Sequence, residues 1–396
     1  MKSRVGRFAA VLALAGLYFL SGKFGLSLAF LNRSASAVWP PTGLALAVLL
    51  IYGYRLWPGI FLGAFLVNFT TQGSLATTMG IATGNSLEAL LGAWLVNRFA
   101  GGARAFDRTQ NLFPYLLLAP LLSTTVSATC GVTSLCLSGF EHWHQFGPVW
   151  LTWWLGDMIS DIIVAPLLLI WITTPARPIK AARVLEWVAF FTVIVIVGGI
   201  IFFGGSFWIT SDPSLEYLAL PPLLWVAFRL EAVGAITAAF ILAALALWGA
   251  LHGYGPFVRA DPNESLLLLQ AFMGAITVTG LVLALLVADS RRAERRLQVQ
   301  EAVSRGLAEA TTLKEAAPRI LRALSGEGIW DWMAIWTQNQ STHELACAGI
   351  WHGGASELDE FETRTSLAGP GVKLAIAQDV KEERPLYFHS RLERPQ

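Results

Sequence analysis

The residues best suited to chemistry lie inside apolar segments of the chain. Asn85 and Glu88 are three residues apart, and Asp157 and Asp161 are four apart. If both segments are helical, each pair lies on one helix face. Charged groups within a bilayer are costly and usually face a bundle interior or a cavity. Carboxylates and an amide on inward faces would bind a cation, a proton or a polar ligand.

A second interpretation of these residues is structural. Arg55 interrupts another apolar region, and its pairing with Glu88, Asp157 and Asp161 would fix helix register without binding anything. Trp39 completes the candidate set, although tryptophans near span ends commonly lie at the membrane interface. One sequence does not show which helix faces meet, so both interpretations stay open.

Composition predicts the environment of these residues. Of 396 residues, 55% are hydrophobic and 14% are charged, with a mean hydropathy of +0.55. Average soluble domains carry about 25% charged residues, so a water-soluble fold is excluded. Arg and Glu are concentrated in 289–396, which predicts a membrane domain followed by a soluble segment.

Apolar runs of about 20 residues are long enough to cross a bilayer as helices. Two further regions, 42–70 and 217–251, are too long for one span and are interrupted at their centres. If each forms a hairpin the chain crosses ten times, and if each is one kinked helix it crosses eight times. The fold class is therefore an all-α polytopic membrane bundle of 8–10 transmembrane helices. The six simple spans are 8–31, 76–97, 112–136, 149–172, 185–209 and 265–288.

Basic residues predict the orientation, because Lys and Arg collect in cytoplasmic loops. With the N-terminus inside, the inner connections hold most of the arginines, including the cluster at 291–296. Both span counts are even, so both place the N- and C-termini in the cytoplasm of a bacterial cell with the chain in its inner membrane. The two broken regions also share an order of features: a Pro-Pro pair, an apolar run, an arginine at the break and a second apolar run. That order suggests an internal repeat.

Four ordered motifs carry a resemblance to a known family. They are 37–43 (AVWPPTG), 53–65 (GYRLWPGIFLGAF), 84–90 (GNSLEAL), and 154–157 (WLGD) followed by Ala165-Pro166. Over about residues 8–288 the chain resembles the membrane-associated sensor domain of MASE type one. That resemblance implies a bacterial sensory module placed ahead of histidine kinase, diguanylate cyclase or phosphodiesterase outputs.

The C-terminal residues predict a cytoplasmic α+β segment. Residues 289–311 are expected to form a signalling helix, whose small-residue stripe at Val299, Val303, Gly306, Ala310, Leu313 and Ala317 would pair in a homodimer or pack on its own domain. A helix through Leu324 and two β-rich runs joined by a polar turn at 338–341 indicate a hairpin. With a further helix near 371–378, the segment 312–396 looks like the opening of a GAF domain, and the chain is expected to stop partway through it.

These features favour a sensory input unit, with the membrane domain at 1–288 and partners comprising the lipid bilayer, a second copy of the chain and an unknown small ligand or membrane protein. A transporter is the alternative, and a truncated chain without activity stays open. No catalytic residue, cofactor, metal site or nucleic-acid contact is predicted, because no kinase, cyclase or phosphate-loop motif is found. His142 and His144 are too few for a metal site, and Cys130, Cys136 and Cys347 match no ligand spacing.

Overall fold

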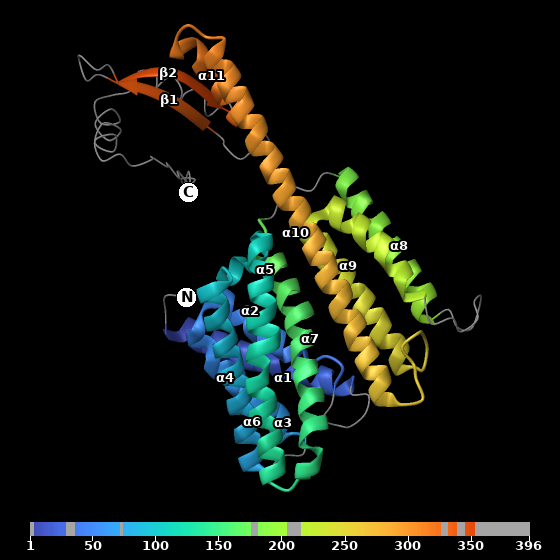
Figure 1. Ribbon diagram of the computed structural model, residues 1–396. Coiled ribbons are helices and arrows are strands. Elements are labelled where there is room, and N and C mark those ends of the chain that lie inside the picture. Colours follow the sequence, from blue (N-terminus) through green and yellow to red (C-terminus); the bar gives the residue numbers. More distant parts are fainter. Residues whose placement is uncertain are drawn as a thin grey trace. The chain divides into compact units, whose positions relative to one another are not determined.

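The apolar segments of the sequence form helices in a computed structural model, which describes residues 4–28, 36–71, 74–175, 181–203, 215–325, 332–338 and 345–352. The chain divides into two units, Met1–Ser290 and Arg291–Gln396. The first unit is a polytopic helical membrane bundle (Figure 1). Six helical stretches among the described residues are long and apolar enough to cross a membrane, at 5–27, 109–137, 143–173, 183–203, 216–251 and 262–308.

The predicted simple spans correspond to named helices. These are α1 (Arg4–Ser27), α4 (Leu75–Phe99), α7 (Phe146–Thr173), α8 (Ala181–Phe203) and α10 (Pro262–Ala308), together with a composite of α5 (Thr109–Leu116), the π-helical η3 (Leu117–Ser123) and α6 (Thr124–Leu137). The π-helical turn contains Pro120, whose missing N–H disturbs regular α-helical bonding. Helix α4 was predicted as a span but is not among the six, because it carries many polar residues.

The first broken region is a pair of short helices. Helix α2 (Pro40–Tyr52) starts at the proline pair, which suits a first turn, and ends at Gly53, whose φ of 93° favours glycine. After the short 3₁₀ turn η1 (Tyr54–Leu56) the chain reverses, and α3 (Trp57–Phe69) packs parallel to α1. Gly59 contacts Leu14, Gly63 contacts Tyr18, and Val67 contacts Gly22. The hairpin interpretation is therefore the one that the structure supports here.

The second broken region, α9 (Leu220–Leu251), reverses direction at Glu231. The part of α9 before Glu231 packs antiparallel to α8, with Arg229 opposite Glu186 and Trp225 opposite Phe190. The part after Glu231 packs parallel to α8, with Leu245 against Gly198 and Gly249 against Phe202. Each broken region thus follows a long helix, α1 or α8, and adds to it a short antiparallel helix and then a parallel one. We call each set a three-helix group. This geometry matches the repeat that the sequence suggests.

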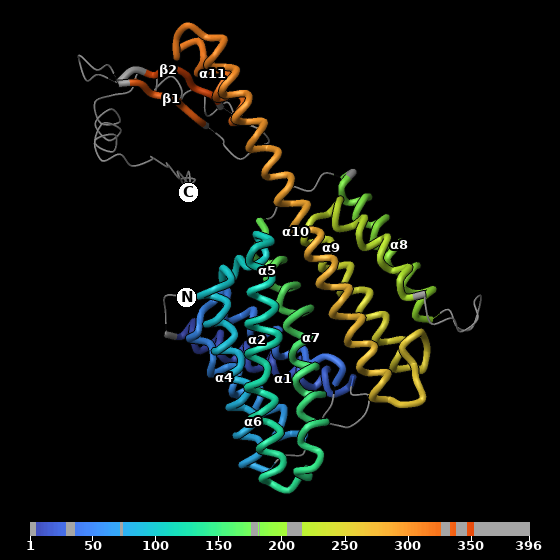
Figure 2. Tube along the Cα trace, in the orientation of Figure 1, coloured from blue at the N-terminus to red at the C-terminus, as the bar shows by residue number. Residues whose placement is uncertain are grey.

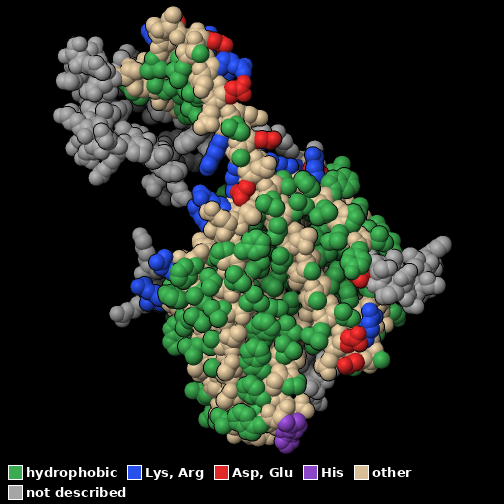
Figure 3. All heavy atoms as spheres, viewed as in Figure 1, with side chains coloured by type: hydrophobic (Ala, Val, Ile, Leu, Met, Phe, Trp, Pro, Cys, Tyr) green, Lys and Arg blue, Asp and Glu red, His purple; other side chains and the backbone are tan. Residues whose placement is uncertain are grey.

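The core of the first unit contains two main clusters of buried apolar residues. One cluster of buried apolar residues joins α1 to α7 and also includes Ile236 of α9 and Leu281 and Leu285 of α10, and the other joins α7 to α8, α9 and α10. Hydrophobic side chains also cover most of the visible face of the bundle, with charged side chains at its margins (Figure 3). An apolar outer surface over a packed interior is what a lipid environment requires.

The second unit begins within α10, which is one uninterrupted helix of 47 residues (Figure 2). It continues with α11 (Leu313–Leu324) and the antiparallel strands β1 (Trp332–Gln338) and β2 (Leu345–His352), and α11 packs on β2. The predicted hairpin is confirmed, although its turn and the predicted helix at 371–378 lie outside the described residues.

One prediction for this unit is wrong. The small-residue stripe does not follow a single helix, because α10 ends at Ala308 and Leu313 and Ala317 belong to α11. Gly306 lies against Arg319 and Ile320 of α11 within the same unit. The chain breaks here because α11 has its own N-cap, Thr312, whose side chain accepts from the backbone N–H of Glu315.

Candidate functional site

The predicted pairs on α4 and α7 meet inside the bundle. Asn85, Glu88, Asp157 and Asp161 are all at most 7% exposed. Glu88 is close enough to both aspartates for electrostatic interaction, so the three carboxylates form one cluster. Among the described residues no lysine, arginine or histidine is buried. The proposed pairing with Arg55 is wrong, because Arg55 lies on the exposed turn η1 and makes no contact with this cluster.

Asp157 is the centre of a hydrogen-bond network. Its Oδ1 accepts a 2.7 Å bond from Thr42 Oγ1 of α2, and its Oδ2 lies 2.8 Å from Ser127 Oγ of α6. Ser127 Oγ is also 2.9 Å from Asn85 Oδ1, and Asn85 Nδ2 donates a 3.0 Å bond to the hydroxyl of Tyr18 on α1. The network therefore joins five helices around one carboxylate.

Close helix packing places these groups. Gly43 of α2 sits directly against α7, where a Cβ would lie 2.5 Å from the carbonyl oxygen of Ser160. The backbone N–H of Gly43 donates a 3.0 Å bond to Ser160 Oγ. Membrane helices pack through small residues of this kind, and the contact brings Thr42 within reach of Asp157.

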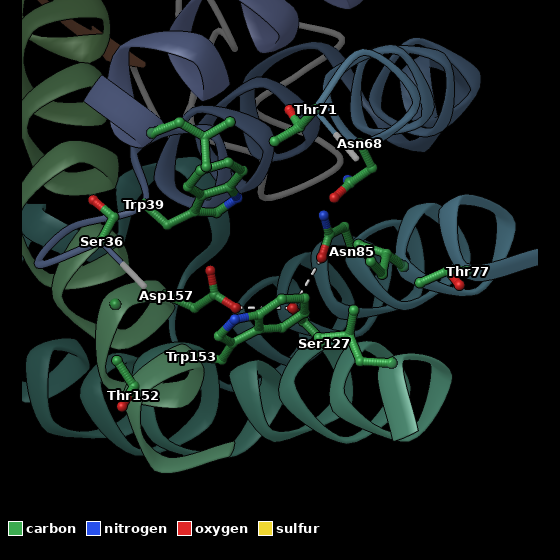
Figure 4. Close-up of a pocket in the computed structure, with 14 residues that line it drawn as sticks. Ser36, Trp39, Asn68, Thr71, Thr77, Asn85, Ser127, Thr152, Trp153 and Asp157 are labelled. Carbon is green, nitrogen blue, oxygen red and sulfur yellow. Dashed lines mark hydrogen bonds between the residues drawn. The ribbon is translucent and has the colours of Figure 1, made fainter. Parts of the chain in front are cut away.

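A cavity of about 110 Å³ opens on this network (Figure 4). Its polar wall includes Asp157, Asn85 and Ser127, and its apolar wall includes two indoles, those of Trp39 and Trp153. Further lining residues come from helices α1, α3, α4, α6 and α7, from the segment before α2 and from the turn after α3: Leu26, Ser36, Asn68, Thr71, Thr77, Ile81, Leu135, Thr152 and Gly156. Trp39 therefore lines the cavity.

Glu88 and Asp161 lie behind the cavity and do not line it. They face a second internal space, shared with Tyr18, Thr42 and Ser123, that is too narrow for a water molecule. Glu88 Oε1 and Asp161 Oδ1 have no hydrogen-bond partner. Buried polar atoms without a partner are costly, so these two oxygens lower the stability of the bundle.

A short segment before α2, Ser36 to Trp39, forms one side of the cavity; we call it the strap. The Trp39 N–H donates to the Gly156 carbonyl of α7 at 3.1 Å. On the other side, Gln270 Nε2 of α10 donates a 3.0 Å bond to the Ala37 carbonyl. The strap thus connects the cavity directly to α10.

Sequence patterns alone did not reveal Tyr18, Thr42, Ser127 and Gln270. Each is an ordinary residue of its own helix and gains a role only from its spatial neighbours. No group of three or more His, Cys, Asp or Glu side chains among the described residues is arranged to hold a metal ion.

Comparison with known families agrees with this architecture. The MASE1 family model matches residues 10–291, and the chain therefore belongs to the MASE1 family of membrane-associated sensory domains. No curated protein and no solved structure matches the chain. The match covers the bundle and the cavity but not α11 or the β-hairpin.

Proposed function

We propose that the chain is the sensory input part of a bacterial signalling protein, and that occupation of the cavity is the stimulus. In this proposal the bundle lies in the inner membrane, both termini are cytoplasmic, and the signal passes along α10. It reaches the α11 and β-hairpin segment, the opening of a GAF-like domain, and then a histidine kinase or cyclic-di-GMP enzyme as output.

One observation carries the proposal: the strap that lines the cavity is hydrogen-bonded to the helix that leaves the bundle. A ligand that contacts Ser36 or Trp39 acts on the segment whose Ala37 carbonyl accepts from Gln270. Near the end of the bundle, the Asp289 carboxylate of α10 accepts a 3.0 Å bond from the backbone N–H of Thr109 at the start of α5. An anion is favourable at a helix N-terminus, so α10 has a second attachment whose strength depends on its position.

A helix that carries a signal needs two positions of similar free energy. We propose that two chains pair along α10 and that the ligand changes how the pair packs. Val299 and Val303, partly exposed residues of α10 beyond the bundle, are available for that contact. Gly306 and Ala317 of the predicted stripe pack within their own unit and would not take part.

The test measures the distance between paired α10 helices. Cys130, Cys136 and Cys347 are replaced, and a spin label is attached through Val299→Cys. The labelled chain is studied in nanodiscs by pulsed electron–electron double resonance. Asp157→Asn serves as the perturbation, because it removes the charge at the centre of the network without needing a known ligand. We expect a dipolar signal between the two chains and a shift of the order of 2 Å or more on Asp157→Asn.

Two results would contradict the proposal. Without a dipolar signal, there is no pairing through α10. With an unchanged distance distribution in Asp157→Asn, the cavity is not coupled to α10. Glu301→Gln, a change on the exposed face of α10, is the control that should leave the distance unaltered.

A transporter is the second candidate, favoured by the two matching three-helix groups and the buried carboxylates. It predicts solute or proton movement through the bundle. Proteoliposomes with an entrapped pH dye and an imposed potassium diffusion potential test for proton entry. Entry above that of empty liposomes would favour the transporter, and equal rates would favour the sensor.

A further inference from the structure

The polar wall of the cavity holds more hydrogen-bond acceptors than hydrogens. The Ser127 hydroxyl lies within 2.9 Å of Asn85 Oδ1 and 2.8 Å of Asp157 Oδ2, but it has only one hydrogen. Asn85 already donates through Nδ2 to Tyr18, and the Thr42 hydroxyl serves the other oxygen of Asp157. With Asp157 ionised, one acceptor is left without a donor, and a ligand that donates N–H groups would satisfy it.

The charge of the wall points the same way. Asp157 is 4% exposed, and the other buried charged residues described are Glu88 and Asp161. An ionised carboxylate buried without a cation is strongly disfavoured, so a positive ligand would stabilise the site where an anion would oppose it. Lys23 of α1 approaches the opposite wall, where its Nζ donates to Thr71 Oγ1 at 2.9 Å, and its hydrogen bonds go to neutral acceptors and not to Asp157.

The apolar side of the cavity also suits a cation. The indoles of Trp39 and Trp153 lie on either side of the Asp157 carboxylate (Figure 4). Trp153 packs against Gly131 of α6, where any Cβ would overlap its ring. Indole faces attract cations within about 6 Å, and the effect is strongest where water is excluded.

We propose that the cavity binds a small organic ammonium ion. Its N–H groups donate to Asp157 and Asn85, and its carbon chain lies between the two indoles. A cavity of about 110 Å³ limits it to a short aliphatic amine. This inference rests on the proposed function, because it names the chemical class of the ligand for the same cavity.

The test compares four probes of similar size with the full chain in nanodiscs, by isothermal titration calorimetry at pH 7. Isobutylamine is a protonated amine at this pH, isobutanol is its neutral counterpart, isobutyrate is an anion, and tetramethylammonium is a cation without N–H groups. We expect isobutylammonium to bind at least about tenfold more tightly than isobutanol and tetramethylammonium, because charge-assisted hydrogen bonds are about twice as strong as neutral ones. We expect no measurable binding of isobutyrate.

Variants locate the binding site. Asp157→Asn should weaken isobutylammonium about tenfold or more and leave isobutanol unchanged. Glu301→Gln, which removes an exposed carboxylate of α10 that does not line the cavity, is the control and should change the affinity less than threefold. If Asp157→Asn does not fold, the comparison of Trp39→Leu with Trp39→Phe locates the site through its aromatic wall, since only leucine removes the aromatic face. Isobutylammonium should bind more weakly to Trp39→Leu than to Trp39→Phe.

Several outcomes overturn the inference: tighter binding of isobutyrate or isobutanol than of isobutylammonium, equal loss in Asp157→Asn and Glu301→Gln, or no loss in Trp39→Leu. Its failure is distinguishable from failure of the proposed function. A chain that binds no ammonium but still shifts α10 on Asp157→Asn remains a sensor of another ligand. A chain that binds ammonium without any shift of α10 has the site but not the relay.

Discussion

The side-chain amide of Gln270 donates a hydrogen bond to the backbone carbonyl of Ala37, 233 residues earlier in the chain. Gln270 is 2% exposed, so this bond is shielded from water and has few substitutes. It joins the strap of the cavity to the one helix that enters both units.

Gln270→Leu should therefore uncouple the cavity from α10. The shift that Asp157→Asn produces between spin labels at position 299 should disappear, and the free energy of unfolding should fall by about 1–3 kcal/mol because the Ala37 carbonyl loses its partner. Thr277→Val is the control on the same helix, since the Thr277 hydroxyl donates only to the Met273 carbonyl of its own helix. If the shift survives in Gln270→Leu, the strap is not the route.

Gly43→Ala should destabilise the bundle. The added methyl group would lie 2.5 Å from the Ser160 carbonyl oxygen and 2.8 Å from the Ala165 nitrogen, both backbone atoms that cannot turn aside. We expect a loss of about 1–3 kcal/mol in thermal or SDS-induced unfolding, typical of an overpacked core. Gly16→Ala is the matched control, because nothing lies within 4 Å of a Cβ at that position. Equal stability of the two variants would contradict close packing of α2 on α7.

Glu231 tests the reversal in α9. Its φ of 58° and ψ of −158° fall in a region that essentially only glycine adopts, and it is the only non-glycine residue with positive φ among those described. Glu231→Gly should be more stable than Glu231→Val by about 1–3 kcal/mol. Both variants lose the carboxylate, so the comparison isolates the backbone. A straight helix at this point would instead make the valine variant the more stable one.

The start of α11 should weaken in acid. Bonds from the side chain and backbone of Thr311 to the Glu315 carboxylate lower the pKa of Glu315 from its usual value. A lowered folded-state pKa means that the stabilisation is present above the unfolded-state pKa, near 4.3, and is lost as the pH falls through the folded-state pKa. Hydrogen exchange, corrected for intrinsic rates, should show less protection of α11 at pH 3.5 than at pH 7.

Glu315→Gln should reduce this protection at pH 7 and remove most of its pH dependence. Glu301→Gln changes an exposed ion pair on α10 that caps no helix, and should leave the protection of α11 unchanged. An equal pH dependence in wild type and Glu315→Gln would exclude this carboxylate as the cause.

The sequence was sufficient for the parts of the structure that depend on local pattern. Apolar length predicts the spans, Pro-Pro and Gly53 predict the ends of α2, and the spacing of Asp157 and Asp161 predicts an inward face. The two strands of the C-terminal hairpin also follow from their composition. Each of these signals is local, because it is contained within one helix or one pair of strands.

The rest depends on contacts across the chain. Thr42 reaches Asp157 over 115 residues, and Ser127 reaches Asn85 over 42. Neither hydroxyl differs in sequence from those that bond only to their own helix, such as Thr277. Arg55 was the clearest error: a basic residue in an apolar region suggested a buried ion pair, but the chain turns at that point and leaves the side chain exposed.

The two three-helix groups differ in what they enclose. The first contributes Tyr18 and Thr42 to a polar network, whereas between 181 and 251 no described polar or charged residue is buried as a whole, and one carboxylate oxygen of Glu216 is buried. One scaffold thus exists twice in the same chain, once around a polar network and once around a largely apolar interior. The apolar group is therefore an internal comparison for the polar one. Hydroxyl or carboxyl groups introduced into it would show how many substitutions are needed to form such a polar network on this scaffold.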